Sequence, residues 1–251
     1  MIEIKQVSKN YAGKSVVDHI SLSIKRGQIT SLIGPNGAGK STLLSMMSRI
    51  ISKDNGEIWI DNKEISKCSS NELAKKISIL KQSNHLQIRL TVKDLVSFGR
   101  FPYSKGRLNS TDKRFVDEAI AYMELEDLQH QFLDQLSGGQ RQRAFIAMVL
   151  AQDTEYILLD EPLNNLDMKH SVQIMKVLRK LVDELGKTVV LVLHDINFAS
   201  CYSDCIIAMK AGKLVNLGDV DKMIQPKVLQ NIYDFEIPVE ELCGKRICVY
   251  F

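Results

Sequence analysis

The sequence contains no long apolar run. Its 251 residues are 45% hydrophobic and 25% charged, which is typical of a globular protein and leaves room for a core with an inserted subdomain. No apolar stretch approaches the roughly 18 residues that a membrane-spanning helix needs. The chain opens on residues 1–7, which indicate a strand and lack the apolar segment of a signal peptide. We therefore expect the protein to stay in the cytosol.

A cysteine framework, a charge excess and internal repeats are also absent. The five cysteines are an odd number, and neither Cys201/Cys205 nor Cys243/Cys248 has the usual spacing of zinc ligands. We expect reduced structural thiols, which suit the cytosol. Lys and Arg number 33 against 30 Asp and Glu, and the resulting net charge of +3 is too small to indicate nucleic-acid binding.

What the sequence does contain is a glycine-rich motif at residues 34–42, of the pattern G-x-x-x-x-G-K-S/T. Glycines let the backbone turn its N–H groups toward phosphate, and the N-terminus of a following helix adds a positive potential. We expect Lys40 to reach the β- and γ-phosphates of a triphosphate and the Ser41 hydroxyl to ligate Mg²⁺. The alternative is a glycine-rich turn with a chance lysine. The expected nucleotide-binding residues of this motif are Gly34, Pro35, Asn36, Gly37, Ala38, Gly39, Lys40, Ser41 and Thr42.

Strand signals gather toward both ends of the chain, and helix signals fill the middle. The apolar runs at 156–159 and 189–193 are typical of parallel strands buried on both faces, and the helix between them is the crossover of a βαβ unit. Strands are expected over residues 2–7, 16–24, 28–33, 57–60, 77–80, 156–159, 189–193, 205–209, 213–217 and 244–251. Helices are expected over residues 42–51, 92–99, 112–124, 139–152 and 168–185, with a loop at 104–110 and two short helices after Asp219.

Acidic and histidine side chains follow two of these buried strands. Asp160 and Glu161 end the first, and His194 ends the second. Ligands of open α/β sheets bind at the carboxyl ends of strands, so these groups are expected at the glycine-rich loop. Asp160 would hold Mg²⁺, Glu161 would orient and activate the attacking water, and His194 would donate to a γ-phosphate. The alternatives are a helix-capping acidic pair and a structural histidine.

A second anion-binding motif opens the helix expected at 139–152. It consists of Ser137, Gly138, Gly139 and Gln140, and a serine with two glycines at a helix start suits an anion. Taken alone, Ser-Gly-Gly is a common loop, and that is the alternative. One triphosphate does not need two anion sites, so we expect this motif to serve a nucleotide bound by another copy of the chain.

The order of these motifs resembles that of the ATP-binding-cassette (ABC) ATPases. The resemblance runs from Walker A at 34–42 through Gln82, the signature at 136–140, Walker B at 157–161 and Asp167 to His194, and covers the chain to about residue 218. It implies a RecA-like α/β P-loop core with an antiparallel β subdomain and an inserted helical subdomain, all in one ABC ATPase domain of residues 1–251. The core would comprise 1–85 and 155–220, the helical subdomain 86–154, and a short C-terminal extension 221–251.

The resemblance also implies ATP and Mg²⁺ as cofactors and a role for each matching residue. Catalytic roles fall to Lys40, Gln82, Glu161 and His194, and metal binding to Ser41, Gln82 and Asp160. Tyr11 matches the aromatic residue that stacks on adenine, with plain strand packing as the alternative. Two copies would form a head-to-tail homodimer that binds two ATP molecules, with Ser137, Gly138, Gly139, Gln140 and Asp167 completing the nucleotide sites.

Within the family, residues 91–103 and 161–170 resemble the ATPases of iron-siderophore and cobalamin importers. This implies transmembrane permease partners that dock near Gln82 and the helical subdomain, an extracytoplasmic substrate-binding protein acting indirectly, no nucleic acid, and a peripheral place on the cytoplasmic face of the membrane. Iron-siderophore uptake is the expected function. The alternatives are the same role for cobalamin, haem or another metal chelate, and a non-transport ABC ATPase. Many relatives carry a Thr-Ser-Ala-Leu-Asp type segment after Glu-Pro, whereas residues 163–167 here keep the aspartate without a hydroxyl.

Overall fold

The computed structural model describes residues 1–82 and 88–250. Its strands are β1 (Ile2–Tyr11), β2 (Lys14–Ile24), β3 (Ile29–Ile33), β4 (Asn55–Ile60), β5 (Lys63–Glu64), β6 (Ile77–Leu80), β7 (Tyr156–Asp160), β8 (Thr188–Val192), β9 (Cys205–Lys210), β10 (Lys213–Asp219), β11 (Val239–Leu242) and β12 (Lys245–Cys248). Its α-helices are α1 (Lys40–Met47), α2 (Ser70–Lys76), α3 (Val92–Phe98), α4 (Phe101–Ser104), α5 (Ser110–Tyr122), α6 (Gly138–Ala151), α7 (Met168–Leu185), α8 (Ile196–Tyr202), α9 (Val220–Met223) and α10 (Pro226–Tyr233).

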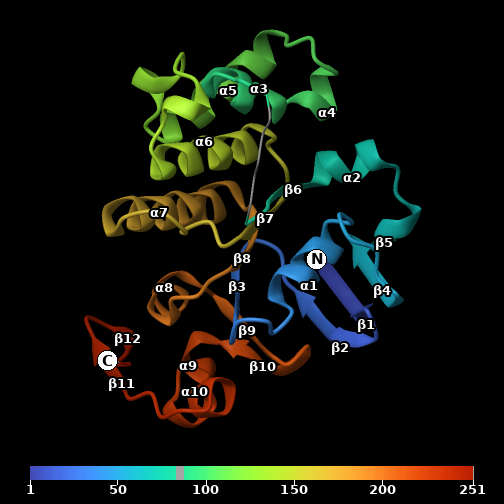
Figure 1. The fold of residues 1–251 in the computed structure, drawn as a ribbon, viewed down its shortest axis with the longest axis vertical. Coiled ribbons are helices and arrows are strands. Elements are labelled where there is room, and N and C mark those ends of the chain that lie inside the picture. Colours follow the sequence, from blue (N-terminus) through green and yellow to red (C-terminus); the bar gives the residue numbers. More distant parts are fainter. Residues whose placement is uncertain (83–87, 251) are drawn as a thin grey trace.

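A six-stranded sheet forms the centre of the molecule, in the order β10-β9-β3-β8-β7-β6. Neighbouring strands from β9 to β6 are parallel, and β10 adds an antiparallel edge. A separate antiparallel sheet has the order β2-β1-β4-β5, and α1 lies between it and the central sheet (Figure 1). The helices α3 to α6 gather at one end of the molecule, and the β11–β12 hairpin lies toward the other (Figure 1).

Alternate residues of the central strands face two different cores. In β8, Val189 and Leu191 belong to the core under α6 and α7, whereas Val190 and Val192 belong to the core around α1. Because side chains alternate across a strand, a strand between two cores must be apolar at every position. This is why the central strands appear in the sequence as continuous apolar runs.

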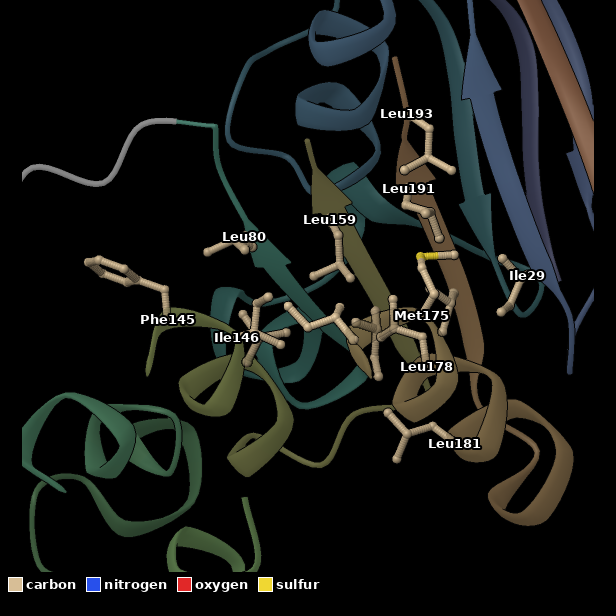
Figure 2. Packing of buried hydrophobic residues seen from close by; sticks show 14 of the residues in the cluster. Ile29, Leu80, Phe145, Ile146, Leu159, Met175, Leu178, Leu181, Leu191 and Leu193 are labelled. Carbon is tan, nitrogen blue, oxygen red and sulfur yellow. The ribbon is translucent and has the colours of Figure 1, made fainter. Parts of the chain in front are cut away.

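The first of these cores joins the helical segment to the sheet. Figure 2 shows Leu80 of β6 and Leu159 of β7 with Ile146 of α6 and with Met175 and Leu178 of α7. All five side chains are fully buried. The wholly apolar body of α6 is thus explained, because this helix packs on the sheet and on its neighbours α3 and α5.

The fold class predicted from the sequence is confirmed: a P-loop α/β core, an antiparallel β subdomain and an inserted helical segment. The predicted helix at 168–185 and strand at 77–80 have the observed bounds. The predicted boundary between 85 and 86 lies outside the described residues, and the remaining domain limits stay predictions.

Several short elements were not predicted: α2, α4, α8, β5 and β11. None of these helices exceeds seven residues or buries more than two apolar side chains, so the sequence shows no clear apolar period for them. The helix predicted over 42–51 begins at Lys40 and ends at Met47, and the final strand ends at Cys248 instead of 251. Phe251 lies outside the described residues.

The structure can be compared with two expectations from the sequence, on membrane-spanning helices and on the cysteines. Within the described ranges, no helix has both the length and the apolar character required to cross a bilayer. All five cysteines are free thiols.

Candidate active site

The glycine-rich loop connects β3 to α1 through backbone conformations that favour glycine. The φ angles of Gly34, Gly37 and Gly39 are 136°, 76° and 94°. A Cβ on Gly34 would lie 1.9 Å from the carbonyl oxygen of Met209, and one on Gly39 would lie 2.4 Å from that of Val16. These two glycines therefore allow the loop to pack directly against the backbone of β9 and β2.

Lys40 lies at the start of α1 and is 5% exposed. Its Nζ donates to the carbonyl oxygens of Gly34 at 2.7 Å and Pro35 at 2.9 Å, so the loop folds around the ammonium group. Burial lowers the pKa of Lys40, and the nearby carboxylates of Glu161 and Asp160 oppose that shift. The amine is thus placed where the loop would receive an anion.

Ser41 and Asp160 meet although 119 residues separate them. The Ser41 Oγ donates to Asp160 Oδ1 at 2.7 Å. Burial raises the pKa of Asp160; the Ser41 hydrogen bond lowers it, and the charge of Glu161 raises it further. Two adjacent, poorly hydrated carboxylates favour a bound cation, and hydroxyl and carboxylate oxygens are ligands that Mg²⁺ accepts. These residues therefore fit a magnesium site.

Glu161 follows β7 in a left-handed backbone conformation, with φ of 52°. Its side chain is 7% exposed and its carboxylate has three hydrogen-bond donors. Gln82 Nε2 donates to Oε2 at 2.6 Å, His194 Nε2 lies 2.6 Å from Oε1, and Asn164 Nδ2 donates to Oε2. A buried acid at the end of a strand, with both oxygens oriented, is suited to act as a general base.

These groups surround one cavity of about 350 Å³, a size typical of small-molecule sites. Its lining residues are Val16, Asn36, Gly37, Ala38, Gly39, Lys40, Ser41, Thr42, Gln82, Glu161 and His194. The structure thus gathers residues predicted from four separate segments. It adds Val16, which carries no chemical signal in the sequence, and Asn164, which does not line this cavity but donates to Glu161.

Tyr11 is not among the described residues that line this cavity. It ends β1 opposite Lys14, its side chain is exposed, and the Lys9 ammonium lies 5.4 Å from the ring centroid. The neighbouring strand β2 contributes Val16 to the cavity. Its stacking on adenine remains a prediction.

The second anion-binding motif is likewise not found among the described residues lining the cavity. Ser137 caps α6: its Oγ accepts the Gln140 amide at 3.2 Å, while Gln140 Oε1 accepts the Ser137 amide at 2.9 Å. Ser137 and Gly138 are exposed. A Cβ on Gly139 would approach a Leu166 methyl group to 3.3 Å, which places the motif beside the segment that follows Glu161.

Asp167 caps the helix α7 that follows this segment. Its carboxylate accepts the His170 backbone amide at 2.9 Å and lies 2.7 Å from His170 Nδ1. These hydrogen bonds, the backbone one first, hold the pKa of Asp167 below its usual value. Its place in the nucleotide site remains a prediction.

Comparisons with known proteins agree with this geometry. The family model described as ABC transporter matches residues 17–164. The petrobactin import ATP-binding protein YclP of Bacillus subtilis (strain 168) is 64% identical over 251 residues, 100% of both chains. The iron(3+)-hydroxamate import ATP-binding protein FhuC of the same organism is 39% identical, covering 100% of this chain and 94% of that one.

A solved structure leads to the same family. The dimeric structure of the ATP-binding cassette MJ0796, in a post-hydrolysis state with bound ADP and Pi, superposes with a TM-score of 0.80 at 35% identity. The match covers 88% of this chain and 99% of that one. The chain therefore belongs to the ABC transporter family, as one of its ATP-binding and ATP-hydrolysing subunits.

Proposed function

We propose that this chain is the ATPase subunit of an importer for an iron-siderophore complex, with Glu161 as the base that activates water. The observation that carries the catalytic part is the convergence of Lys40, Ser41 and Glu161 on one cavity beside a glycine-rich loop, with Asp160 hydrogen-bonded to Ser41. The proposed cargo is supported by the similarity of this chain to petrobactin and iron(3+)-hydroxamate import ATP-binding proteins. The exposed aromatic side chains of residues 91–103 support a permease partner.

In this proposal the loop binds the triphosphate and Lys40 neutralises its β- and γ-phosphates. Ser41 and Asp160 would hold Mg²⁺, with the amide oxygen of Gln82 as a further ligand. The ion would neutralise charge on the phosphates. Glu161 would orient the attacking water and accept its proton, while His194 would donate to the γ-phosphate.

The proposed assembly is a head-to-tail homodimer. Ser137 and Gly138 of the signature motif are exposed, Gly139 and Gln140 are half-buried, and none of the four is among the described residues that line the cavity. The helix start would therefore bind a nucleotide of another copy. ATP would favour the closed dimer more than ADP and phosphate do, and this difference in affinity would drive the conformational cycle.

A permease would dock on the helical segment near Gln82. Phe98 at the end of α3 and Phe101 in α4 are 51% and 58% exposed. Large aromatic side chains that remain exposed and close together are typical of interaction sites. This assembly would place the chain on the cytoplasmic face of the membrane, with a substrate-binding protein on the opposite side and without direct contact to the cargo.

The test is transport in vesicles by the permease complex that co-purifies with this chain. We expect ATP-dependent uptake of ferric petrobactin or a ferric hydroxamate. Glu161→Gln should retain ATP binding and lower turnover at least about 100-fold, because the water loses its base. Phe101→Asp should leave hydrolysis by the isolated chain unchanged and weaken co-purification with the permease.

The outcomes separate the parts of the proposal. Uptake of cobalamin or haem without any ferric siderophore would overturn the cargo and leave the ATPase role standing. Turnover near wild type in Glu161→Gln would overturn the assignment of the base.

A further inference from the structure

We propose that Asn164 is a positioning residue that holds the Glu161 carboxylate in its reactive orientation. This inference rests on the proposed role of Glu161 as the base. The segment 163–167 has no hydroxyl side chain. The structure places an amide donor there instead, aimed at the carboxylate.

The turn that follows β7 brings the two residues together. Glu161 has a left-handed φ of 52°, a conformation that a glutamate adopts at an energetic cost. The Asn164 backbone amide donates to the Glu161 carbonyl at 3.3 Å and closes the turn. The Asn164 side chain then donates to Oε2 of the same residue. One residue thus stabilises both the strained backbone of Glu161 and the direction of its side chain.

Among the described residues, the side chains that face the carboxylate leave one acceptor position open. A carboxylate offers about four lone-pair directions, two on each oxygen. Gln82 and Asn164 donate to Oε2, and His194 Nε2 lies beside Oε1. Within the described part of the chain, the open acceptor position is therefore on Oε1. The attacking water would therefore be received on that oxygen, because Asn164 and Gln82 together occupy the other.

Asn164 lines a second cavity and is not among the described residues that line the proposed nucleotide cavity. Glu161 and His194 line the nucleotide cavity and also a second cavity of about 230 Å³. Gln82 is among the lining residues of the first cavity, and Asn164 is among those of the second. Glu161 thus lines both cavities, and its two amide donors belong to different ones. Changing Asn164 should therefore disturb the base without disturbing the bound nucleotide.

The experiment compares Asn164→Asp, Asn164→Ala and Asn164→Ser in ATP hydrolysis. Asn164→Asp has the same shape but replaces the donor by a like charge, and should lower kcat about 30- to 100-fold, as expected when a catalytic group is misplaced. Asn164→Ala should lower kcat about tenfold, and Asn164→Ser, which regains a donor, should recover part of that loss. The KM and the calorimetric affinity for ATP should stay within about twofold of wild type in all three.

Two controls make the result decisive. Asn216 lies in β10, where its side chain accepts the Leu217 amide, and Asn216→Ala should leave kcat unchanged. Glu161→Gln tests the base itself. If Glu161→Gln is inactive while Asn164→Asp keeps wild-type kcat, the positioning role is wrong. If Glu161→Gln is itself active, the proposed base is wrong. If the three Asn164 variants lose ATP affinity or thermal stability in parallel with kcat, Asn164 is a structural residue and the proposal fails.

Discussion

At the scale of single residues, Asp61 joins the antiparallel sheet to the central sheet. It lies between β4 and β5, and its side chain is 14% exposed. Tyr156, the first residue of β7, and Arg26, between β2 and β3, both donate to Oδ1, and Lys76 of α2 donates to Oδ2. Burial alone would raise the pKa of Asp61, but the hydrogen bonds from Arg26, the amino group of Met1, Tyr156 and Lys76 hold it well below the usual range.

Replacing Asp61 by Asn should lower the free energy of unfolding by about 2 to 3 kcal/mol at pH 7, because donors that include charged groups lose a charged acceptor. A carboxylate with a depressed folded pKa stabilises the protein above its unfolded pKa of about 3.9, and this contribution is lost as the pH falls toward the folded pKa. Urea unfolding at pH 7 and at about pH 3.5 should show the difference between wild type and variant shrinking. The exposed partner of Arg26 provides the control, since Glu155→Gln should have little effect. A difference that stays constant with pH would contradict the role of the charge.

Also at this scale, the sequence predicted the site residues that can be recognised by residue type and motif. It missed those whose role depends on the three-dimensional arrangement. Lys40, Asp160 and His194 were found because their types recur at strand ends and in a glycine-rich motif. Asn164 was not, because its role depends on the left-handed backbone of Glu161, which no residue type reveals. Val16 was missed because it contributes to the cavity only through the packing of β2 on the loop.

At the scale of elements, Gly99 sets how closely α3 approaches α6. It follows α3 with an ordinary helical φ of −55°, so its need for glycine is not a matter of backbone conformation. A Cβ there would lie 2.2 Å from the Met148 carbonyl oxygen of α6. The next residue, Arg100, is buried and donates to Asp112 and to the Ala151 carbonyl. Gly99 and Arg100, within the segment 91–103 that resembles importer ATPases, are therefore explained by packing. The exposed Phe98 and Phe101 are the residues of this segment that could contact a partner.

Replacing Gly99 by Ala should lower the free energy of unfolding by about 1 to 3 kcal/mol, because the extra methyl group forces two helix backbones apart. Thermal unfolding would measure this. Gly218 in β10 is the matched control, since a Cβ there would meet its nearest atom at 3.5 Å, an ordinary contact. Equal stability of the Gly99→Ala and Gly218→Ala variants would contradict the close approach.

Helices and strands were predicted correctly where a continuous stretch of sequence shows a clear apolar pattern. The strands β7 and β8 and the helix α7 have apolar patterns long enough to be read directly, and they were predicted to within one residue at each end. The order β10-β9-β3-β8-β7-β6 was not predicted in full, because it depends on pairings between segments far apart in the sequence. The capped helices α2 and α8 were missed because each has only seven residues and few buried apolar side chains, too few to show an apolar pattern in the sequence.

At the scale of the whole molecule, the nucleotide cavity and the signature motif do not meet within one copy. Ser137 caps α6 and is exposed, whereas Lys40 is buried in the cavity wall. A helix start that can bind an anion and a phosphate cradle that do not meet in one chain could complete each other across a two-fold dimer. Each nucleotide site would then take Lys40 from one copy and Ser137 from the other.

Mixing two inactive variants tests this arrangement. Lys40→Ala removes the charge from the phosphates, and Ser137→Arg blocks the signature, so each variant alone should have little activity. In a mixed dimer with shared sites, one site carries both lesions and the other carries neither, so ATP hydrolysis should reappear above the level of either variant. Sites built within single chains could not recover, because each chain would keep its own lesion. Absence of recovery, with mixed dimers demonstrated by differently tagged copies, would contradict the shared site; a mixture of Lys40→Ala with Glu161→Gln is the control that should stay inactive, since both lesions fall on the same half of the site and leave neither site intact.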